Sequence, residues 1–479
     1  MKSNKVFSNF LWRFLERCGA QGITIIVSVI LARLLDPEVY GTIALVTVFT
    51  TILQVFVDSG MGNALIQKKD ADDLDFSTVF YYNLAVCILL YGILIAAAPL
   101  ISRFYGLPEL TPVIRVLGIT LIVSGVKNIQ QAYVSRNMMF KRFFFATIGG
   151  TLGAAVIGIV MAYKGFGVWA LVAQHLFNLV VDTVILWITV KWRPKLMFSF
   201  ARLKSLFSFG WKLLASSLID TLYNDLRQLI IGKLYTKTDL AFFNKGKLFP
   251  NIIVTNINTS IDSVLLPTMS ESQDDRERVR AMTRRAIKTS TYIMAPLMIG
   301  LAAAAESFVS LILTDKWLFC VPYLRVFCIT YMFYPIHTAN LNAIKAMGRS
   351  DIYLKLEIVK KSVGMVVLLS TMWFGVMAMT YSMIFTSILS QIINSWPNKK
   401  LLGYSYPFQL RDILPGILLA VFMGGCVWCI ELAGLGAFVT LVLQVVAGGI
   451  IYVAGSVIFK LESFIYLRDT LLAKLRKQK

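Results

Sequence analysis

Apolar stretches of roughly twenty residues recur from one end of the chain to the other, with short polar segments between them. Since an α-helix rises about 1.5 Å per residue, such a stretch crosses the roughly 30 Å hydrocarbon core of a bilayer. The alternating pattern of a membrane β-barrel, in segments of about ten residues, is absent from the sequence. We therefore predict an all-α membrane protein with about 14 transmembrane helices. The expected spans are 12–35, 40–60, 77–101, 112–134, 144–163, 167–190, 207–234, 241–269, 286–313, 321–345, 355–374, 377–397, 411–431 and 436–459.

Short motifs recur six spans apart and in the same order, which indicates an internal repeat. The matched pairs are "PVIRVLGIT" (112–120) with "PYLRVFCIT" (322–330), "FLWRF" (10–14) with "FGWKL" (209–213), and "VDSG" (57–60) with "IDSV" (261–264). Because six is an even number of crossings, both halves have the same orientation in the membrane. A parallel repeat of this kind is a transporter architecture with its substrate site between the halves.

The repeat predicts two pseudo-symmetric six-helix bundles followed by two extra helices. The expected domains are an N-terminal six-helix bundle at 1–203, a C-terminal six-helix bundle at 204–400, two extra transmembrane helices at 401–459, and a basic amphipathic cytoplasmic tail at 460–479. The tail mixes apolar residues with a basic face, so we expect it to lie on the inner membrane surface.

Composition agrees with a membrane protein and the charge distribution orients it. The 479 residues are 57% hydrophobic and only 15% charged, with a formal net charge of +21. Most of the 47 Lys and Arg fall at the inward ends and loops when the N-terminus is placed inside, for example in 191–206 and 276–288. This asymmetry is the positive-inside rule, and it predicts that both termini are cytoplasmic. The charge is explained by topology, so we expect no nucleic acid partner.

Polar side chains follow one face of several spans. Residues three and four apart share a helix face. The seventh span carries Lys212, Ser216, Asp220, Tyr223, Asn224 and Arg227; the first carries Arg13, Glu16, Arg17, Gln21, Thr24 and Ser28; the eighth carries Asn244, Lys247, Asn251, Thr255, Asn258 and Asp262. A charge at the centre of a membrane helix costs about 2.5–3.5 kcal/mol, so the stripes predict a water-filled central cavity. Asp225 lies off the stripe of its helix and has no role in this interpretation.

The predicted cavity has more cations than acids, which favours an anionic substrate. Guanidinium groups match phosphate oxygens, and amides and hydroxyls suit sugars. The candidate substrate-binding residues are Arg13, Arg17, Gln21, Lys127, Lys212, Asp220, Asn224, Arg227, Lys247 and Asn251. The acids Glu16, Asp58 and Asp262 are candidates for binding a coupling ion, either H⁺ or Na⁺.

Two purely structural explanations apply to individual residues of these polar stripes. A single Ser, Thr or Asn in a membrane helix is commonly a packing contact between helices. Lys and Arg near a helix end can extend to the interface instead of facing a cavity. Neither interpretation accounts for stripes on several repeat-related helices together.

The sequence predicts no metal site, cofactor or catalytic centre. The "CVWC" motif at 426–429 lies inside an expected span, and His175 and His337 form no metal motif. A membrane polymerase or ligase typically needs a sizeable outward loop, and every expected outward loop is short. We therefore expect a protein that is not an enzyme.

Several motifs resemble the polysaccharide transporter family. They are "ILARLLDPEVYGTIALVTVF" (30–49), "DSGMGNALIQKKD" (58–70), "LRQLIIGKLYTKTDLAFFNKG" (226–246), "DSVLLPTMSESQDDRERVR" (262–280) and "DKWLFCVPYLRVF" (315–327). Members of that family are lipid-linked oligosaccharide flippases of the multidrug/oligosaccharidyl-lipid/polysaccharide exporter superfamily. The resemblance is to the branch of exopolysaccharide, colanic-acid-like or teichuronic-acid-like exporters.

The resemblance implies a function and a location. It implies two six-helix bundles plus helices 13 and 14, and alternating-access flipping of undecaprenyl-pyrophosphate-linked oligosaccharide units across the bacterial cytoplasmic (inner) membrane. The polysaccharide would be exopolysaccharide, capsule or lipopolysaccharide. Membrane lipids and the polysaccharide polymerase machinery are the candidate partners. The alternative function is a cation-coupled drug or small-molecule antiporter of the same superfamily, which the basic surplus disfavours.

Overall fold

The computed structural model describes residues 2–58, 61–68, 70–137 and 139–477, and these form helices joined by short connections, without strands. The predicted all-α class is confirmed for this part of the chain. The chain divides into two compact units, Met1–Ala241 and Phe242–Lys479. Ten helical segments of the described chain are long and apolar enough to cross a membrane, so the chain is a multi-pass membrane protein. The count of fourteen spans and the two-bundle layout stay predictions.

The N-terminal unit contains eight helices and the start of a ninth in its described residues. They are α1 (Lys2–Leu34), α2 (Pro37–Asp58), α3 (Met61–Gln67), α4 (Asp73–Tyr105), α5 (Leu110–Arg136), α6 (Phe140–Tyr163), α7 (Val168–Thr189) and α8 (Phe200–Leu234), with α9 (Lys237–Ser270) continuing into the second unit. The sequence analysis missed α3, which is too short to show a helical period.

The second unit holds the remaining helices of the described chain. They are α10 (Arg276–Ala303), α11 (Ala305–Ile312), the 3₁₀ helix η1 (Asp315–Cys320), α12 (Val321–Met332), α13 (Tyr334–Ala346), α14 (Ser350–Thr371), α15 (Val376–Leu402), α16 (Tyr406–Glu431), α17 (Ala437–Ile458) and α18 (Glu462–Lys477). The expected span 321–345 is divided at Phe333, because Pro335 lies in the first turn of α13, where its missing N–H leaves no hydrogen bond unmade.

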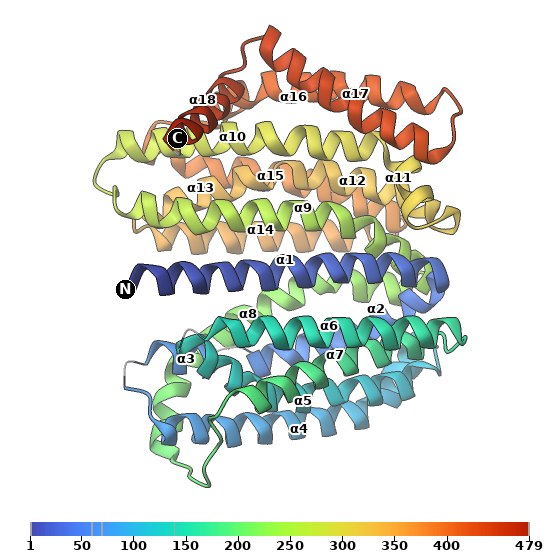
Figure 1. Ribbon diagram of the computed structural model, residues 1–479, viewed down its shortest axis with the longest axis vertical. Coiled ribbons are helices and arrows are strands. Elements are labelled where there is room, and N and C mark those ends of the chain that lie inside the picture. Colours follow the sequence, from blue (N-terminus) through green and yellow to red (C-terminus); the bar gives the residue numbers. More distant parts are fainter. Residues whose placement is uncertain (1, 59–60, 69, 138, 478–479) are drawn as a thin grey trace. The chain divides into compact units, whose positions relative to one another are not determined.

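Helices of the N-terminal unit pack closely in pairs. Helix α6 lies between α1 and α7, and α4 runs along α5 (Figure 1). Small residues allow the close approach of α6 and α7: a Cβ at Gly153 would lie 2.5 Å from the ring of Phe177, and one at Gly150 would lie 2.8 Å from the carbonyl oxygen of Asn178. Such small-residue contacts are typical of membrane helix packing.

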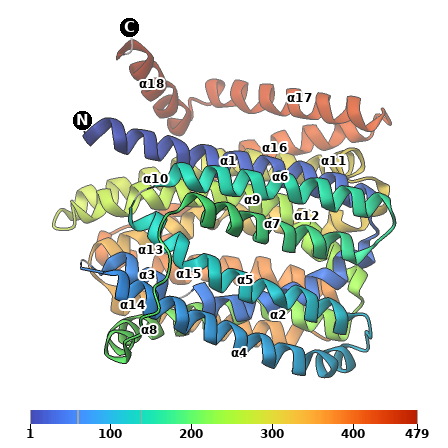
Figure 2. The ribbon, with the colours of Figure 1, turned by 60° about the horizontal axis from the view of Figure 1, so that its bottom comes forward.

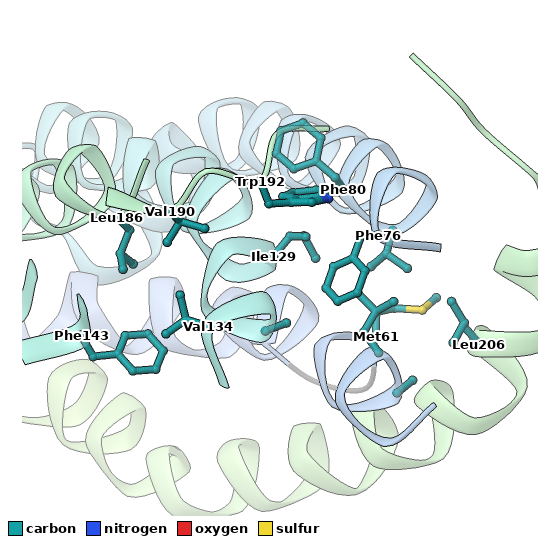
Figure 3. Close-up of a cluster of buried hydrophobic side chains, with 14 of the residues drawn as sticks. Met61, Phe76, Phe80, Ile129, Val134, Phe143, Leu186, Val190, Trp192 and Leu206 are labelled. Carbon is teal, nitrogen blue, oxygen red and sulfur yellow. The ribbon is translucent and has the colours of Figure 1, made fainter. Parts of the chain in front are cut away.

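One buried apolar cluster packs six helices of this unit together. It joins α3, α4, α5, α6, α7 and α8 through Met61, Phe76, Phe80, Ile129, Val134, Phe143, Leu186, Val190, Trp192 and Leu206 (Figure 3). Trp192 belongs to the linker between α7 and α8, so the linker takes part in the core. A capping box of Asp72 and Asp75 begins α4 beside this cluster.

In the second unit, α10 packs along α16, and α16 packs along α17. Figure 2 shows α16 and α17 side by side, with α18 leaving the end of α17 at an angle. Helix α18 is fixed to α10 by an ion pair between Glu462 and Lys288 and by the Arg285 guanidinium, 4.7 Å from the ring centre of Tyr466. Lys288 also lies 3.9 Å from Asp412 of α16.

A buried group of amide side chains joins three helices of the second unit. Asn340 on α13 and Gln409 on α16 exchange two hydrogen bonds of 2.9 and 3.0 Å, and Asn398 on α15 donates to Asn340 Oδ1 at 2.7 Å. All three side chains are completely buried. Buried amides need such partners, because an unsatisfied one costs about 1–3 kcal/mol.

Candidate functional site

Two long helices expose polar faces at helical spacing. On α8, Ser216, Asp220 and Asn224 are exposed at four-residue intervals, and Arg227, three residues further along, is half-buried. On α9, the exposed polar residues Asn251, Thr255, Thr259 and Asp262 follow the same rule. Neither α8 nor α9 is among the ten helices apolar enough to be spanning candidates. Both are nevertheless of spanning length, with 35 and 34 residues.

Two polar side chains beside the polar face of α9 donate hydrogen bonds within the helix. Ser260 donates to the carbonyl of Asn256 at 2.8 Å, and the Asn256 amide donates to the carbonyl of Ile252 at 2.9 Å. These bonds to the preceding turn leave oxygen lone pairs available on the helix surface. The surface can therefore accept further hydrogen bonds from water or a solute.

Most of the other predicted binding residues belong to the first unit. The structure describes the side chains of some of them and not of others. Gln21 is half-buried on α1. Arg13 and Arg17 belong to α1 and Lys212 to α8, but the side chains of these three cations lie outside the described residues. In the second unit, Lys247 is half-buried on α9.

Glu16 and Asp58, two of the predicted ion-coupling acids, make contacts inside the N-terminal unit. Glu16 is buried on α1 and accepts a 3.4 Å hydrogen bond from the hydroxyl of Thr147 on α6. Asp58, the last residue of α2, accepts from the Gln54 amide at 2.9 Å and from the Asn128 amide at 3.4 Å. The third acid, Asp262, is exposed on α9 and lies in the other unit.

Lys127 on α5 has a carboxylate partner that the sequence analysis did not identify. Its Nζ lies 2.5 Å from Oδ2 of Asp182 on α7, with side-chain exposures of 16% and 10%. The other carboxylate oxygen of Asp182 is buried without a hydrogen-bond partner. Lys127 also interacts electrostatically with Asp58, so these residues form one polar group spanning α2, α5 and α7. An acid inside an expected span was the signal that could have revealed Asp182, since a membrane-buried carboxylate requires a partner.

Asp225, which the stripe did not explain, is half-buried on α8. Its Oδ1 accepts a 2.9 Å hydrogen bond from the amide of Gln228, one turn along the same helix. This local hydrogen bond helps to keep the carboxylate away from the polar face.

A charged group at the start of α9 was also missed. The Nζ of Lys237 lies 3.2 Å from Glu38 at the start of α2 and 3.0 Å from Glu109 before α5. Thr42 donates to the same Glu109 oxygen at 3.0 Å. The backbones also approach closely, because a Cβ at Gly41 would lie 1.9 Å from the carbonyl oxygen of Lys237. Three segments of the N-terminal unit are thus joined at one point.

Metal chemistry has no support among the described residues, where no three His, Cys, Asp or Glu residues gather in the manner of a metal site. The six cysteines are free. His337 lies on α13 with its Nδ1 3.0 Å from the amide of Asn394 on α15. It is therefore a hydrogen-bonded member of a helix interface.

Comparison with known proteins confirms the resemblance seen in the motifs. Residues 30–322 match the family described as polysaccharide biosynthesis protein. The teichuronic acid biosynthesis protein TuaB of Bacillus subtilis is 24% identical over 420 residues, covering 84% of this chain and 85% of that protein. The lipopolysaccharide biosynthesis protein WzxC of Escherichia coli is 24% identical over 433 residues, covering 88% of each. The succinoglycan biosynthesis transport protein ExoT of Rhizobium meliloti is 25% identical over 332 residues, or 69% of this chain and 67% of that one.

Solved structures share the fold. The lipid II flippase MurJ, in an inward closed conformation, superposes with a TM-score of 0.76 at 13% identity, covering 94% of this chain and 98% of that chain. An inward-facing multidrug resistance transporter of the MATE family has a TM-score of 0.63 at 15% identity, covering 80% of this chain and 94% of that chain. At these identities the similarity establishes the fold and nothing finer.

Proposed function

Because the chain belongs to the polysaccharide biosynthesis protein family, we propose that it is a flippase for lipid-linked oligosaccharides. The proposed substrate is an undecaprenyl-pyrophosphate-linked repeat unit, moved across the bacterial inner membrane for polysaccharide assembly. The observation that carries the proposal is similarity, over most of the chain, to proteins named for the synthesis or transport of surface polysaccharides. The polar faces of α8 and α9 support it from the chemistry of the chain itself.

The polar faces suit a substrate rich in hydroxyl groups. Asp220 and Asn224 are exposed on α8, and Asn251 is exposed on α9. Polar groups on helices of spanning length are stable only against water or other polar groups, because hydrocarbon cannot hydrogen-bond them. We propose that these faces contact an aqueous path on which sugar hydroxyls exchange hydrogen bonds with amides.

In this proposal the cations of α1 and α8 bind the pyrophosphate. Arginine presents a planar fork of donors that matches two phosphate oxygens, and several cations are needed to balance a pyrophosphate. Arg13, Arg17, Lys212 and Arg227 are assigned this role, with Asp220 adjusting their charge. Lys247 adds a cation on α9. Lys127 can contribute to binding only after it separates from Asp182, so its role differs from that of the others.

Coupling of transport is proposed to use H⁺ or Na⁺ bound at Glu16, Asp58 or Asp262.

Both termini are proposed to be cytoplasmic, from the distribution of Lys and Arg. The polysaccharide polymerase is the proposed partner that consumes the translocated unit.

Deleting the gene in the native bacterium tests this function. We expect loss of one surface polysaccharide and accumulation of its undecaprenyl-linked unit on the cytoplasmic leaflet, out of reach of a glycan-binding probe added to spheroplasts. A polymerase defect would instead leave the unit accessible to that probe. Normal polysaccharide together with new sensitivity to cationic drugs would contradict the proposal and favour the antiporter. Restoration by a plasmid-borne copy is the control.

A further inference from the structure

The linker between α7 and α8 is a non-helical segment that is bound to α4 and α5. The Trp192 indole donates to Asp73 Oδ1 at 3.1 Å, and the buried Gln130 amide donates to the carbonyl of Trp192 at 3.1 Å. The Trp192 ring stacks on Tyr133 with centroids 5.9 Å apart. Figure 3 shows Trp192 among Phe76, Phe80 and Ile129. The beginning of the linker is therefore part of the packed core.

Polar contacts with the first two turns of α4 hold the rest of the linker. The backbone N–H of Lys195 donates to the hydroxyl of Ser77 at 3.0 Å, and that of Ser199 donates to the hydroxyl of Thr78 at 3.2 Å. The Lys195 ammonium lies 2.6 Å from Asp73. Because both hydroxyls are fully buried, these bonds fix which side of the linker faces the protein.

The opposite side of the linker exposes large apolar side chains at alternate positions. Leu196 is 95% exposed, Phe198 44% and Phe200 79%. The rings of Phe198 and Phe200 meet edge to face, with centroids 4.9 Å apart. Leu196, Phe198 and Phe200 therefore form an exposed linker strip, while the backbone beside them is hydrogen-bonded to α4.

Basic residues border the linker strip. Lys191 precedes it and Lys204 follows it, both exposed. Arg202 lies between them, 3.5 Å from Asp72. The strip also follows closely on a membrane helix, since α7 is a spanning candidate that ends at Thr189. The linker therefore begins at the boundary of the bilayer.

We propose that the linker strip inserts into the headgroup region of a membrane surface that contains anionic phospholipids. Aromatic and leucine side chains bordered by Lys and Arg are the chemistry of interfacial anchors, in which apolar groups enter the acyl boundary and cations meet phosphates. The inserted strip anchors the start of α8, because Phe200 is the first residue of that helix. This inference requires that α7 crosses the bilayer and is independent of the transported substrate.

A protein partner fits this surface less well. A stable protein interface buries about 800 Å² on each side, which is far more than three side chains in a row provide. A lipid surface needs no complementary shape, and it is already adjacent to the end of α7.

Quenching by spin-labelled lipids tests the proposal on the full-length protein in vesicles. Cys18, Cys426 and Cys429, the cysteines that are not buried, are first replaced by Ser. An environment-sensitive fluorophore is then attached at Leu196→Cys or Phe198→Cys, with Met197→Cys, a half-buried position between them, as the matched control. In vesicles of phosphatidylcholine and phosphatidylglycerol, we expect lipids labelled near the headgroup to quench positions 196 and 198 about twofold more than position 197.

The vesicle composition separates the two parts of the proposal. Omitting phosphatidylglycerol should reduce quenching at position 198, and Lys191→Gln with Lys204→Gln should remove that dependence on anionic lipid. Equal quenching at 197 and 198, or none at either, would overturn insertion. Quenching at 198 that ignores phosphatidylglycerol would overturn the role of the bordering cations. Unchanged melting temperatures of the labelled proteins exclude unfolding as the cause.

Discussion

The ammonium of Lys127 on α5 forms an ion pair of 2.5 Å with the carboxylate of Asp182 on α7, where both side chains are largely buried. Burying two charges is stable only while they remain paired, because a single buried ion loses its hydration without compensation. The pair therefore ties α5 to α7, and each residue makes the other tolerable within the membrane region.

Removing either member of this pair should destabilise the protein. We expect Lys127→Met or Asp182→Leu alone to cost about 3–5 kcal/mol and to lower the melting temperature in detergent. The double variant should recover most of the loss, since neither member of the pair is then buried without the other. If the double variant is as unstable as the sum of the two single variants, the pair is not the relevant interaction.

Removing the proposed pyrophosphate cations should abolish export while leaving the fold intact. We expect Arg17→Ala with Arg227→Ala to eliminate surface polysaccharide at normal protein levels, because the phosphate loses charge-assisted hydrogen bonds. Arg349→Ala is the matched control: this arginine is exposed and pairs with Asp351 at 2.9 Å. Normal export from the double variant would remove these residues from the site.

The polar faces of α8 and α9 should be accessible to water in vesicles. Asn224→Cys on α8 and Asn251→Cys on α9 should react with a charged thiol reagent roughly tenfold faster than Val184→Cys, because the reactive thiolate forms only where water reaches it. Val184 is exposed and apolar on α7, where we expect lipid. Similar rates at the three positions would show that these faces do not line an aqueous path.

Substituting Gly41 should disturb the contact between the starts of α2 and α9. A Cβ there would lie 1.9 Å from a backbone oxygen, so Gly41→Ala requires a backbone shift and should cost about 1–3 kcal/mol or more. Gly92→Ala on α4 is the control, since a Cβ at Gly92 meets nothing within 4 Å. Thermal melting of both variants checks this, and equal stability of the two would contradict the close approach.

The sequence allowed the helical class and the polar faces to be predicted, because both depend on local periodicity. The four-residue spacing of Asp220 and Asn224 is visible in the sequence and survives in the structure as an exposed face. The division of the expected span 321–345 at Phe333 was not visible, because Pro335 in the first turn of a helix leaves the apolar pattern unbroken.

Pairings between distant residues could not be predicted from periodicity. Asp182 lies far along the chain from Lys127, and only the packing of α5 and α7 brings them together. The same holds for Lys237 with Glu38 and Glu109, which belong to three separate segments. These contacts depend on which helices become neighbours, and local periodicity does not reveal that.

The attachment of α18 to α10 matters for anyone who shortens the protein for expression. Ending the chain at Ile458 would remove Glu462 and Tyr466, the partners of Lys288 and Arg285. Lys288 would still have Asp412 as a partner, at 3.9 Å. That carboxylate already accepts hydrogen bonds from Arg284 and from the hydroxyl of Tyr404. A truncated version would thus carry uncompensated positive charge at Arg285 and Lys288 in the first half of α10, where detergents with anionic headgroups would bind it preferentially.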